Sequence, residues 1–184
     1  MRKLWRLGER SLSIRAIQPD DETLWLALMK NMSWATRYKR GARRPEELRP
    51  EDARRAVSPD PGNEIALVAM AASASEQDMV GVARAARSGA ETWEFALVVL
   101  DAWQRRGVGR RLMIALMESL QEHRAKVLEG DVIASNRNML DFVTRLGFEI
   151  RAHPDQPHVK RVARRLGQRG EAVDAESTEQ GSDI

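Results

Sequence analysis

The fold of this chain is constrained most strongly by residues 94–113, where an apolar run, a glycine loop and a helical pattern follow one another. The run Phe95–Leu100 is apolar throughout and has an acidic residue on either side, which predicts a buried strand. Gly107 and Gly109 come next, and apolar residues then recur at helical spacing over Val108–Leu120. The sequence therefore predicts a strand, a tight glycine loop and a helix in direct succession.

Such a loop suits an anion. The first turn of a helix has N–H groups without intrahelical partners, and the helix dipole favours negative charge there. Glycine lets the backbone approach a phosphate closely. No Lys-Ser/Thr pair follows the glycines, so the loop is not a Walker A motif, and its spacing is not G-x-G-x-x-G. We therefore expect a diphosphate site, with positive charge added by Arg105, Arg106, Arg110 and Arg111.

The sequence of residues 94–113 resembles that of a known enzyme superfamily. Gln104-x-x-Gly107-x-Gly109 after a strand resembles the Q/R-x-x-G-x-G/A signature of the GNAT superfamily of N-acetyltransferases. Three flanking motifs are similar to the acetyltransferase domain of bacterial protein-lysine acetyltransferases: Glu94-Phe-Ala, Asp101-x-Trp103-Gln104 and Arg110-Arg-Leu-Met. In that family the domain is often fused to an acyl-CoA-synthetase-like region and sometimes stands alone.

The order of expected elements agrees with this resemblance, which covers about residues 12–166. Alternation and short apolar runs predict strands at Ser11–Ile17, Ile65–Ala72, Met79–Arg87, Glu91–Leu100, Val127–Ile133, Phe148–Ala152 and Val159–Leu166. Helices are expected after Pro19 and over Pro50–Val57, Val108–His123 and Asn136–Leu146. The resemblance implies an α/β (α+β) GNAT fold, with a mixed, mostly antiparallel sheet of about six to seven strands. About four helices would flank this sheet, and a V-shaped splay would separate its fourth and fifth strands.

Size and charge divide the chain into three parts. A chain of 184 residues with 42% apolar content suits one domain, expected at residues 11–166 after a basic extension at 1–10. Residues 167–184 are polar and hold one Arg against five acidic residues, so we expect an acidic, disordered tail. The net charge of this tail is −4 and that of the whole chain is +3, so residues 1–166 carry a net charge of +7. A basic body fits an anionic cofactor.

Several functional classes are disfavoured. The absence of cysteine removes disulfides, thiolate metal sites and a catalytic Cys, and it fits a reducing cytoplasm. The three His residues have no partner at metal-ligand spacing, so no metal is expected. No apolar run approaches the length of a membrane span, and the N-terminus lacks the apolar core of a secretory signal. The scattered Trp residues argue against a nucleic-acid stacking platform. We expect a cytoplasmic protein with no membrane or nucleic-acid partner.

The resemblance implies acetyl-CoA as the acyl-donor cosubstrate. Its diphosphate would lie on the N–H groups of the glycine loop, and its pantetheine arm would pair with the free edge of the preceding strand. A backbone N–H near Leu97 or Val98 would face the thioester oxygen. Asn136 matches the superfamily Asn that contacts this arm, and it would equally serve as a helix N-cap. The expected cofactor-binding residues are Leu97, Val98, Val99, Leu100, Gln104, Arg105, Arg106, Gly107, Val108, Gly109, Arg110 and Asn136.

Catalytic and acceptor residues follow from the same resemblance. Glu94 occupies the place of a glutamate that is proposed to deprotonate the attacking lysine in the matched family. The alternative is an ordinary exposed charge at a strand end. Val143 stands where many superfamily members have a Tyr general acid, so the proton source for the thiolate is unassigned. Arg37 and Tyr38 match a pair beside the acceptor site, and the alternative for this basic stretch is a solvated face.

The expected function is acetyl transfer from acetyl-CoA to a primary amine, with Glu94 as general base. The favoured acceptor is a protein lysine. Two alternatives remain open at this point: a small-amine acetyltransferase acting on a polyamine, amino acid or antibiotic, and a non-catalytic CoA-binding regulatory module. The free edge of a splayed sheet is often paired in dimers, so a homodimer is one option for its assembly.

Overall fold

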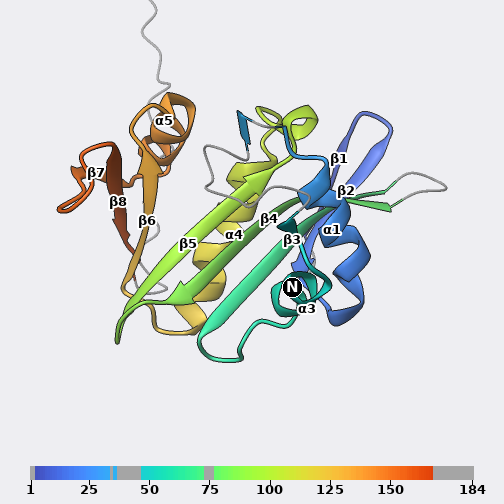
Figure 1. Ribbon diagram of the computed structural model, residues 1–184, viewed down its shortest axis with the longest axis horizontal. Helices are drawn as coiled ribbons and strands as arrows, with labels where there is room; N and C mark the ends of the chain where they lie inside the picture. Colours follow the sequence, from blue (N-terminus) through green and yellow to red (C-terminus); the bar gives the residue numbers. More distant parts are fainter. Residues whose placement is uncertain (1–2, 34, 37–46, 73–76, 168–184) are drawn as a thin grey trace, which may run out of the picture.

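The computed structural model describes residues 3–33, 35–36, 47–72 and 77–167. These residues form one eight-stranded sheet with the order β1-β2-β3-β4-β5-β6-β8-β7 (Figure 1). Neighbouring strands are antiparallel except for β5 and β6, which are parallel. The strands are β1 Lys3–Leu7, β2 Arg10–Ala16, β3 Glu64–Ala72, β4 Gln77–Arg87, β5 Thr92–Val99, β6 Val127–Ile133, β7 Glu149–Ala152 and β8 Val159–Arg165. The α-helices are α1 Glu22–Lys30, α3 Pro50–Val57, α4 Val108–Glu122 and α5 Arg137–Arg145, with 3₁₀ turns at Pro19–Asp21 and Asp101–Trp103.

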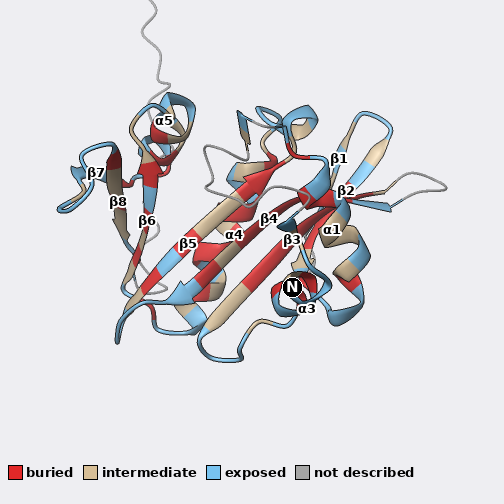
Figure 2. Cartoon of the chain, viewed as in Figure 1, coloured by how far each residue is buried: buried red, intermediate tan, exposed pale blue. Residues whose placement is uncertain are grey.

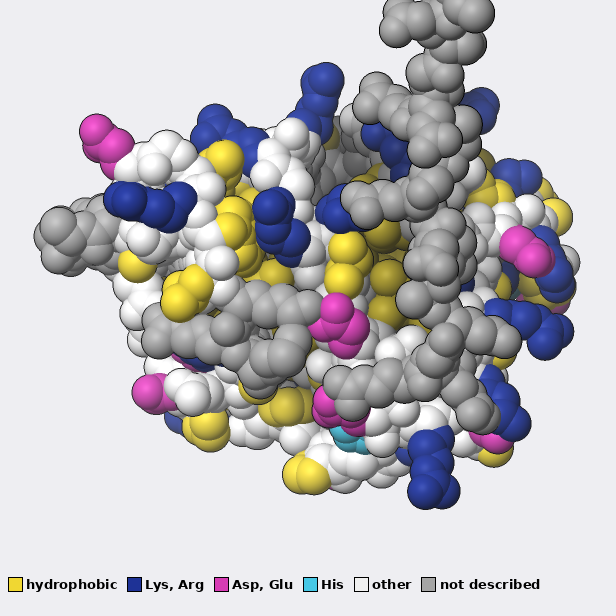
Figure 3. Space-filling view, turned by 180° about the vertical axis from the view of Figure 1, so that it is seen from behind, with side chains coloured by type: hydrophobic (Ala, Val, Ile, Leu, Met, Phe, Trp, Pro, Cys, Tyr) yellow, Lys and Arg dark blue, Asp and Glu magenta, His cyan; other side chains and the backbone are white. Residues whose placement is uncertain are grey.

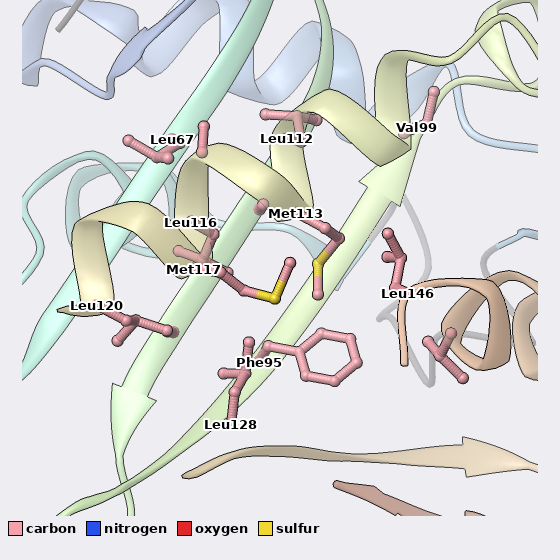
Figure 4. Packing of buried hydrophobic residues seen from close by; sticks show 14 of the residues in the cluster. Leu67, Phe95, Val99, Leu112, Met113, Leu116, Met117, Leu120, Leu128 and Leu146 are labelled. Carbon is pink, nitrogen blue, oxygen red and sulfur yellow. The ribbon is translucent and has the colours of Figure 1, made fainter. Parts of the chain in front are cut away.

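The helices cover both faces of the sheet. In Figure 1, α4 lies behind the central strands, α1 and α3 lie in front of them, and α5 stands beside β6. The middle strands are therefore buried on both sides, as the red segments of Figure 2 show. On the α4 face, Met113 and Met117 extend toward Phe95 of β5 (Figure 4). On the other face, Val98 of β5 packs in a second cluster with residues of α1 and α3.

The predicted mixed, mostly antiparallel sheet with flanking helices is confirmed, and the structure adds one strand to it. Lys3–Leu7, expected to be a basic extension, forms β1 and pairs with β2 at the sheet edge. Trp5 and Leu7 pack against the main core, which holds this short hairpin in place. The sequence prediction missed this strand because Leu4, at 67% exposed, spoils a simple apolar alternation. Residues 168–184, which make up almost all of the expected tail, lie outside the described residues.

The parallel pair separates early. β5 and β6 are paired only at Thr92–Val127, Trp93–Leu128 and Glu94–Glu129, although both strands continue beyond these positions. β6 instead stays paired with β8 along its whole length, so it turns away from β5 together with β7 and β8. The strands splay after Glu94, and they are the fourth and fifth of the predicted strands, between which the V was expected.

An aromatic ring fills the fork of this splay. Phe95 is the first β5 residue beyond the paired segment, and it is 7% exposed. Its ring lies against Gly130 of β6, where an added Cβ would come within 2.8 Å of Phe95 Cε1. It also meets the ring of Phe148 edge to face, at 5.3 Å between centroids. We conclude that the bulk of Phe95 occupies the space in which the next parallel pair would otherwise form.

Candidate active site

A cleft of about 770 Å³ opens where β5 and β6 part. Its walls are β5 from Phe95 onward, the loop between β5 and α4, the end of β6, and α5. Nine of the twelve expected cofactor residues line this one cleft: Leu97, Val98, Val99, Gln104, Arg105, Gly107, Gly109, Arg110 and Asn136. The other three are elsewhere: Val108 is buried in the core, and Leu100 and Arg106 are outside the lining. The structure thus brings most of the expected site together.

The edge of β5 presents backbone groups to this cleft. Val98 is opposite Val82 of β4, and the N–H of Leu100 bonds to the Val80 carbonyl at 3.0 Å. Because successive residues of a strand point their backbone groups to opposite sides, even-numbered residues bond to β4 and odd-numbered ones face the splay. The N–H and C=O of Leu97 and the N–H of Val99 are thereby left for a ligand. Of the two N–H groups considered from the sequence, Leu97 rather than Val98 faces the cleft.

The glycine loop adds further free donors. Gly107 is the N-cap of α4 with φ of 79°, in the left-handed region that favours glycine. The N–H groups of Arg105, Arg106 and Gly107 have no acceptor among the described residues. They adjoin the first turn of a helix of 15 residues, whose dipole attracts anions. The arrangement is chemically suited to a diphosphate.

Basic side chains surround this loop. Arg105 and Arg110 line the cleft, and neither forms an ion pair within the described ranges. In the view from behind, Lys and Arg side chains lie along the upper part of the molecule, at the height at which Figure 1 places this loop (Figure 3). Arg145 of α5 also lines the cleft, and sequence reasoning did not select it. Its place depends on how α5 packs over the splay, and the helical pattern alone does not reveal that.

Gln104 is held by a hydrogen-bond network that the sequence did not reveal. Its Nε2 donates to the Val99 carbonyl at 3.0 Å and to Thr36 Oγ1 at 3.2 Å. Thr36 Oγ1 donates to Asp101 Oδ1 at 2.9 Å, and Ser33 donates to the same carboxylate from Oγ and N. Desolvation acts to raise the pKa of Asp101, but the hydrogen bonds from Thr36 and Ser33 together hold that pKa below its usual value. Asp101 is therefore ionised at neutral pH.

Glu94 lies at the closed end of the splay. It is the last β5 residue paired with β6, and it precedes Phe95, where the lining of the cleft begins. Since Phe95 faces α4, strand alternation turns Glu94 to the opposite face, which α1 and α3 cover farther along the sheet. The side chain is exposed. The register also places Glu94 next to Glu129, which is 3.5 Å from Arg161 Nη1.

The remaining expected residues differ in their placement. Asn136 caps α5, since its Oδ1 accepts the Met139 N–H at 3.4 Å, and it also lines the cleft. Both of its sequence interpretations are therefore compatible with its position. Val143 is fully buried, whereas its neighbour Phe142 lines the cleft. Arg37 and Tyr38 lie outside the described residues.

Metal ligands and membrane-spanning helices are the two other features that bear on function. The described ranges contain no group of three or more His, Asp or Glu residues arranged to hold a metal ion. Within the same ranges, no helix combines the length and apolar character needed to cross a membrane.

Comparisons with known proteins agree with this geometry. Residues 26–148 match the model of the acetyltransferase (GNAT) family. The GNAT domain of S. lividans PAT superposes with a TM-score of 0.77 at 21% identity, covering 90% of this chain and 97% of that one. A GNAT-family acetyltransferase from Streptococcus pneumoniae gives 0.64 at 16% identity, covering 85% and 99%. An acetyltransferase from Thermus thermophilus gives 0.65 at 20% identity, covering 84% and 97%.

Proposed function

The chain belongs to the acetyltransferase (GNAT) family of acyl-CoA N-acyltransferases, and from this premise we propose that it transfers an acetyl group from acetyl-CoA to a protein lysine. The observation that carries the proposal is the cleft between β5 and β6, which joins a free strand edge to a loop of free N–H groups. A strand edge can pair with the amides of a pantetheine arm, and the loop can hold a diphosphate. One cleft thus fits both ends of the same cosubstrate.

The chemistry requires three groups. The lysine nitrogen attacks the thioester carbon, the C–S bond breaks, and the CoA thiolate leaves. The Leu97 N–H, which faces the cleft, would stabilise the developing oxyanion. Glu94, close to the N-terminal end of the same strand, would accept the proton that the amine loses. Solvent would then protonate the thiolate, since Val143 supplies no acidic group in the place of a Tyr.

The motifs around Glu94 and Gln104 and the exposure of Glu94 favour a protein lysine as acceptor. The S. lividans structure is the GNAT domain of a protein acetyltransferase, although at 21% identity its likeness speaks for the fold alone. The motifs around Glu94 and Gln104 resemble that branch more specifically. Glu94 is also exposed, so a side chain carried by another protein can reach it.

The experiment is a turnover assay with acetyl-CoA and lysine-containing peptides, run beside a panel of polyamines and amino acids. Glu94→Gln should lower kcat by about 10²- to 10⁴-fold, which is the range for loss of a general base. Glu91→Gln is the matched control, because Glu91 is exposed in the same segment and pairs with Lys126 at 2.7 Å. Full activity of Glu94→Gln would remove the base assignment. If only small amines were acetylated, the acceptor would be a small amine and not a protein lysine. If CoA bound without any turnover, the protein would be a CoA-binding module and not an enzyme.

A further inference from the structure

Asp101 belongs to the segment that defines the site, yet the proposed chemistry gives it no part. It contacts neither the cleft nor the free N–H groups of the loop. Its carboxylate instead accepts a hydrogen bond from the Thr36 hydroxyl, which in turn accepts one from the Gln104 amide. We propose that Asp101, acting through Thr36, fixes the Gln104 amide as a cap on the Val99 carbonyl, and that this cap sets the register in which the pantetheine arm of acyl-CoA pairs with β5. The inference rests on the proposed function, since it takes this arm to be the ligand of the strand edge.

The hydrogen-bond chemistry permits one orientation of the amide. An ionised carboxylate only accepts, so the Thr36 hydroxyl hydrogen points to Asp101 and its oxygen lone pair faces Gln104. The amide group nearest Thr36 must therefore be the donating Nε2, which also reaches the Val99 carbonyl. A rotated amide would set its own oxygen against two acceptors. Thus a charge at Asp101 determines which atom of Gln104 lies on the strand edge.

The cap changes what β5 offers to a ligand. With the Val99 carbonyl occupied, the groups left on the cleft side are the N–H and C=O of Leu97 and the N–H of Val99. An uncapped Val99 carbonyl would give an amide N–H of the pantetheine arm a second acceptor besides the Leu97 carbonyl, two residues nearer the loop. Two residues of strand correspond to about 7 Å, so pairing there would draw the thioester that far from the Leu97 N–H and from Glu94. The cap thereby excludes an unproductive register.

The network also explains why Thr36 matters despite its distance in sequence. Thr36 is 65 positions from Asp101, lies after α1 and lines the cleft. Its hydroxyl is the link between the carboxylate and the amide. Thr36→Val keeps the shape of the side chain and removes this link, whereas Thr36→Ser keeps the hydroxyl. The two variants separate the hydrogen bond from the packing.

The test measures acetyl-CoA turnover with a lysine peptide, and CoA and ADP binding by isothermal titration calorimetry, on the wild-type protein and these variants. CoA engages both the loop and the strand edge, whereas ADP has a diphosphate and no arm. Without the link the amide is free to rotate and the shifted register becomes available; if about one-tenth of the bound acetyl-CoA then lies in the productive register, kcat falls about tenfold. CoA affinity should not fall, because a second register adds a way to bind. ADP affinity should not change either, and Thr36→Ser should restore kcat. Thr144→Val is a matched control, since that hydroxyl donates to the Leu140 carbonyl within α5.

Three results would overturn the inference. If Thr36→Val has the same kcat as the wild type, the cap does not control the arm. If it loses affinity for CoA and ADP equally, the network shapes the loop and not the strand edge. In both cases the proposed function stands, because wild-type CoA binding and turnover are unaffected. If the wild type itself does not bind CoA, the proposed function fails and the inference fails with it.

Discussion

The two glycines of the loop should respond in opposite ways to the same substitution. Gly107 has φ of 79°, a backbone conformation that costs an L-residue about 1–2 kcal/mol. Gly109 lies in the first turn of α4 with no such φ, and a Cβ there would meet Leu97 Cδ2, Val99 Cγ2 and Phe142 Cζ at 3.6–3.7 Å. Those are ordinary van der Waals distances. Alanine should therefore be strained at the first glycine and accommodated at the second.

The magnitudes follow from these backbone conformations. For Gly107→Ala, alanine in the unfolded chain has less conformational freedom than glycine, which offsets part of the strain and leaves a loss of about 1 kcal/mol. The Arg111 Nη1 atom, 2.8 Å from the added Cβ, is the end of a flexible side chain and can move away. For Gly109→Ala, the higher helix propensity of alanine should add about 0.5 kcal/mol. In a chain of this size 1 kcal/mol shifts Tm by about 2–4 °C.

Differential scanning fluorimetry measures both variants directly. We expect Gly107→Ala to melt about 2–4 °C below the wild type and Gly109→Ala at or slightly above it. CoA titration should show the larger loss for Gly107→Ala, because the change in φ redirects the neighbouring N–H groups. Gly107→Asn serves as a control, since Asn tolerates the left-handed region better than Ala. If Gly107→Ala melts above Gly109→Ala, the reasoning from backbone conformation is wrong.

Two further predictions concern stability. Gly130→Ala should lower the free energy of unfolding, measured by urea denaturation, by about 1–3 kcal/mol, because its Cβ would come within 2.8–3.2 Å of the Phe95 ring. Adding Phe95→Leu to this variant should recover part of the loss. Full stability of Gly130→Ala alone would contradict the close approach. The hydrogen bond from Arg15 lowers the pKa of Asp21, so the pair stabilises the fold above the unfolded-state pKa and this stability is lost as pH falls through the lower folded-state pKa. Asp21→Asn should therefore lower Tm at neutral pH and flatten its decline below about pH 4; an unchanged pH profile of Tm would show that this pair does not stabilise the fold.

The strand and helix bounds were largely predictable because each element carries its own local signal. Val127–Ile133 was placed without error, since its apolar residues lie between polar ones and a helix end. Asn136 indicated the start of α5, because a side-chain oxygen at an N-cap replaces a missing backbone acceptor. The edge strand β1 was missed because Leu4, which is exposed, breaks the apolar alternation that indicates a half-buried strand.

The loop was also predictable, for a different reason. Its signature records a backbone requirement, a positive φ at Gly107, which restricts the residue type at that position. The partner of Gln104 was not predictable. Thr36 is far from it in sequence, and a single Thr in a polar stretch carries no periodic or spacing signal. Contacts between distant segments appear only when the sheet brings both to the same end.

The division of β5 between its two faces indicates where acceptor selectivity should reside. The groups that would hold the cosubstrate are backbone atoms, which nearly any residue supplies. Side chains on the α1 and α3 face are not constrained in this way. Glu94, Ala96 and Val98 alternate onto that face, where Val98 already contacts the second core cluster. Substitutions at Ala96, which also lines the cleft, should therefore raise the KM for the acceptor more than they weaken CoA binding. The reverse result would place the acceptor on the α4 face.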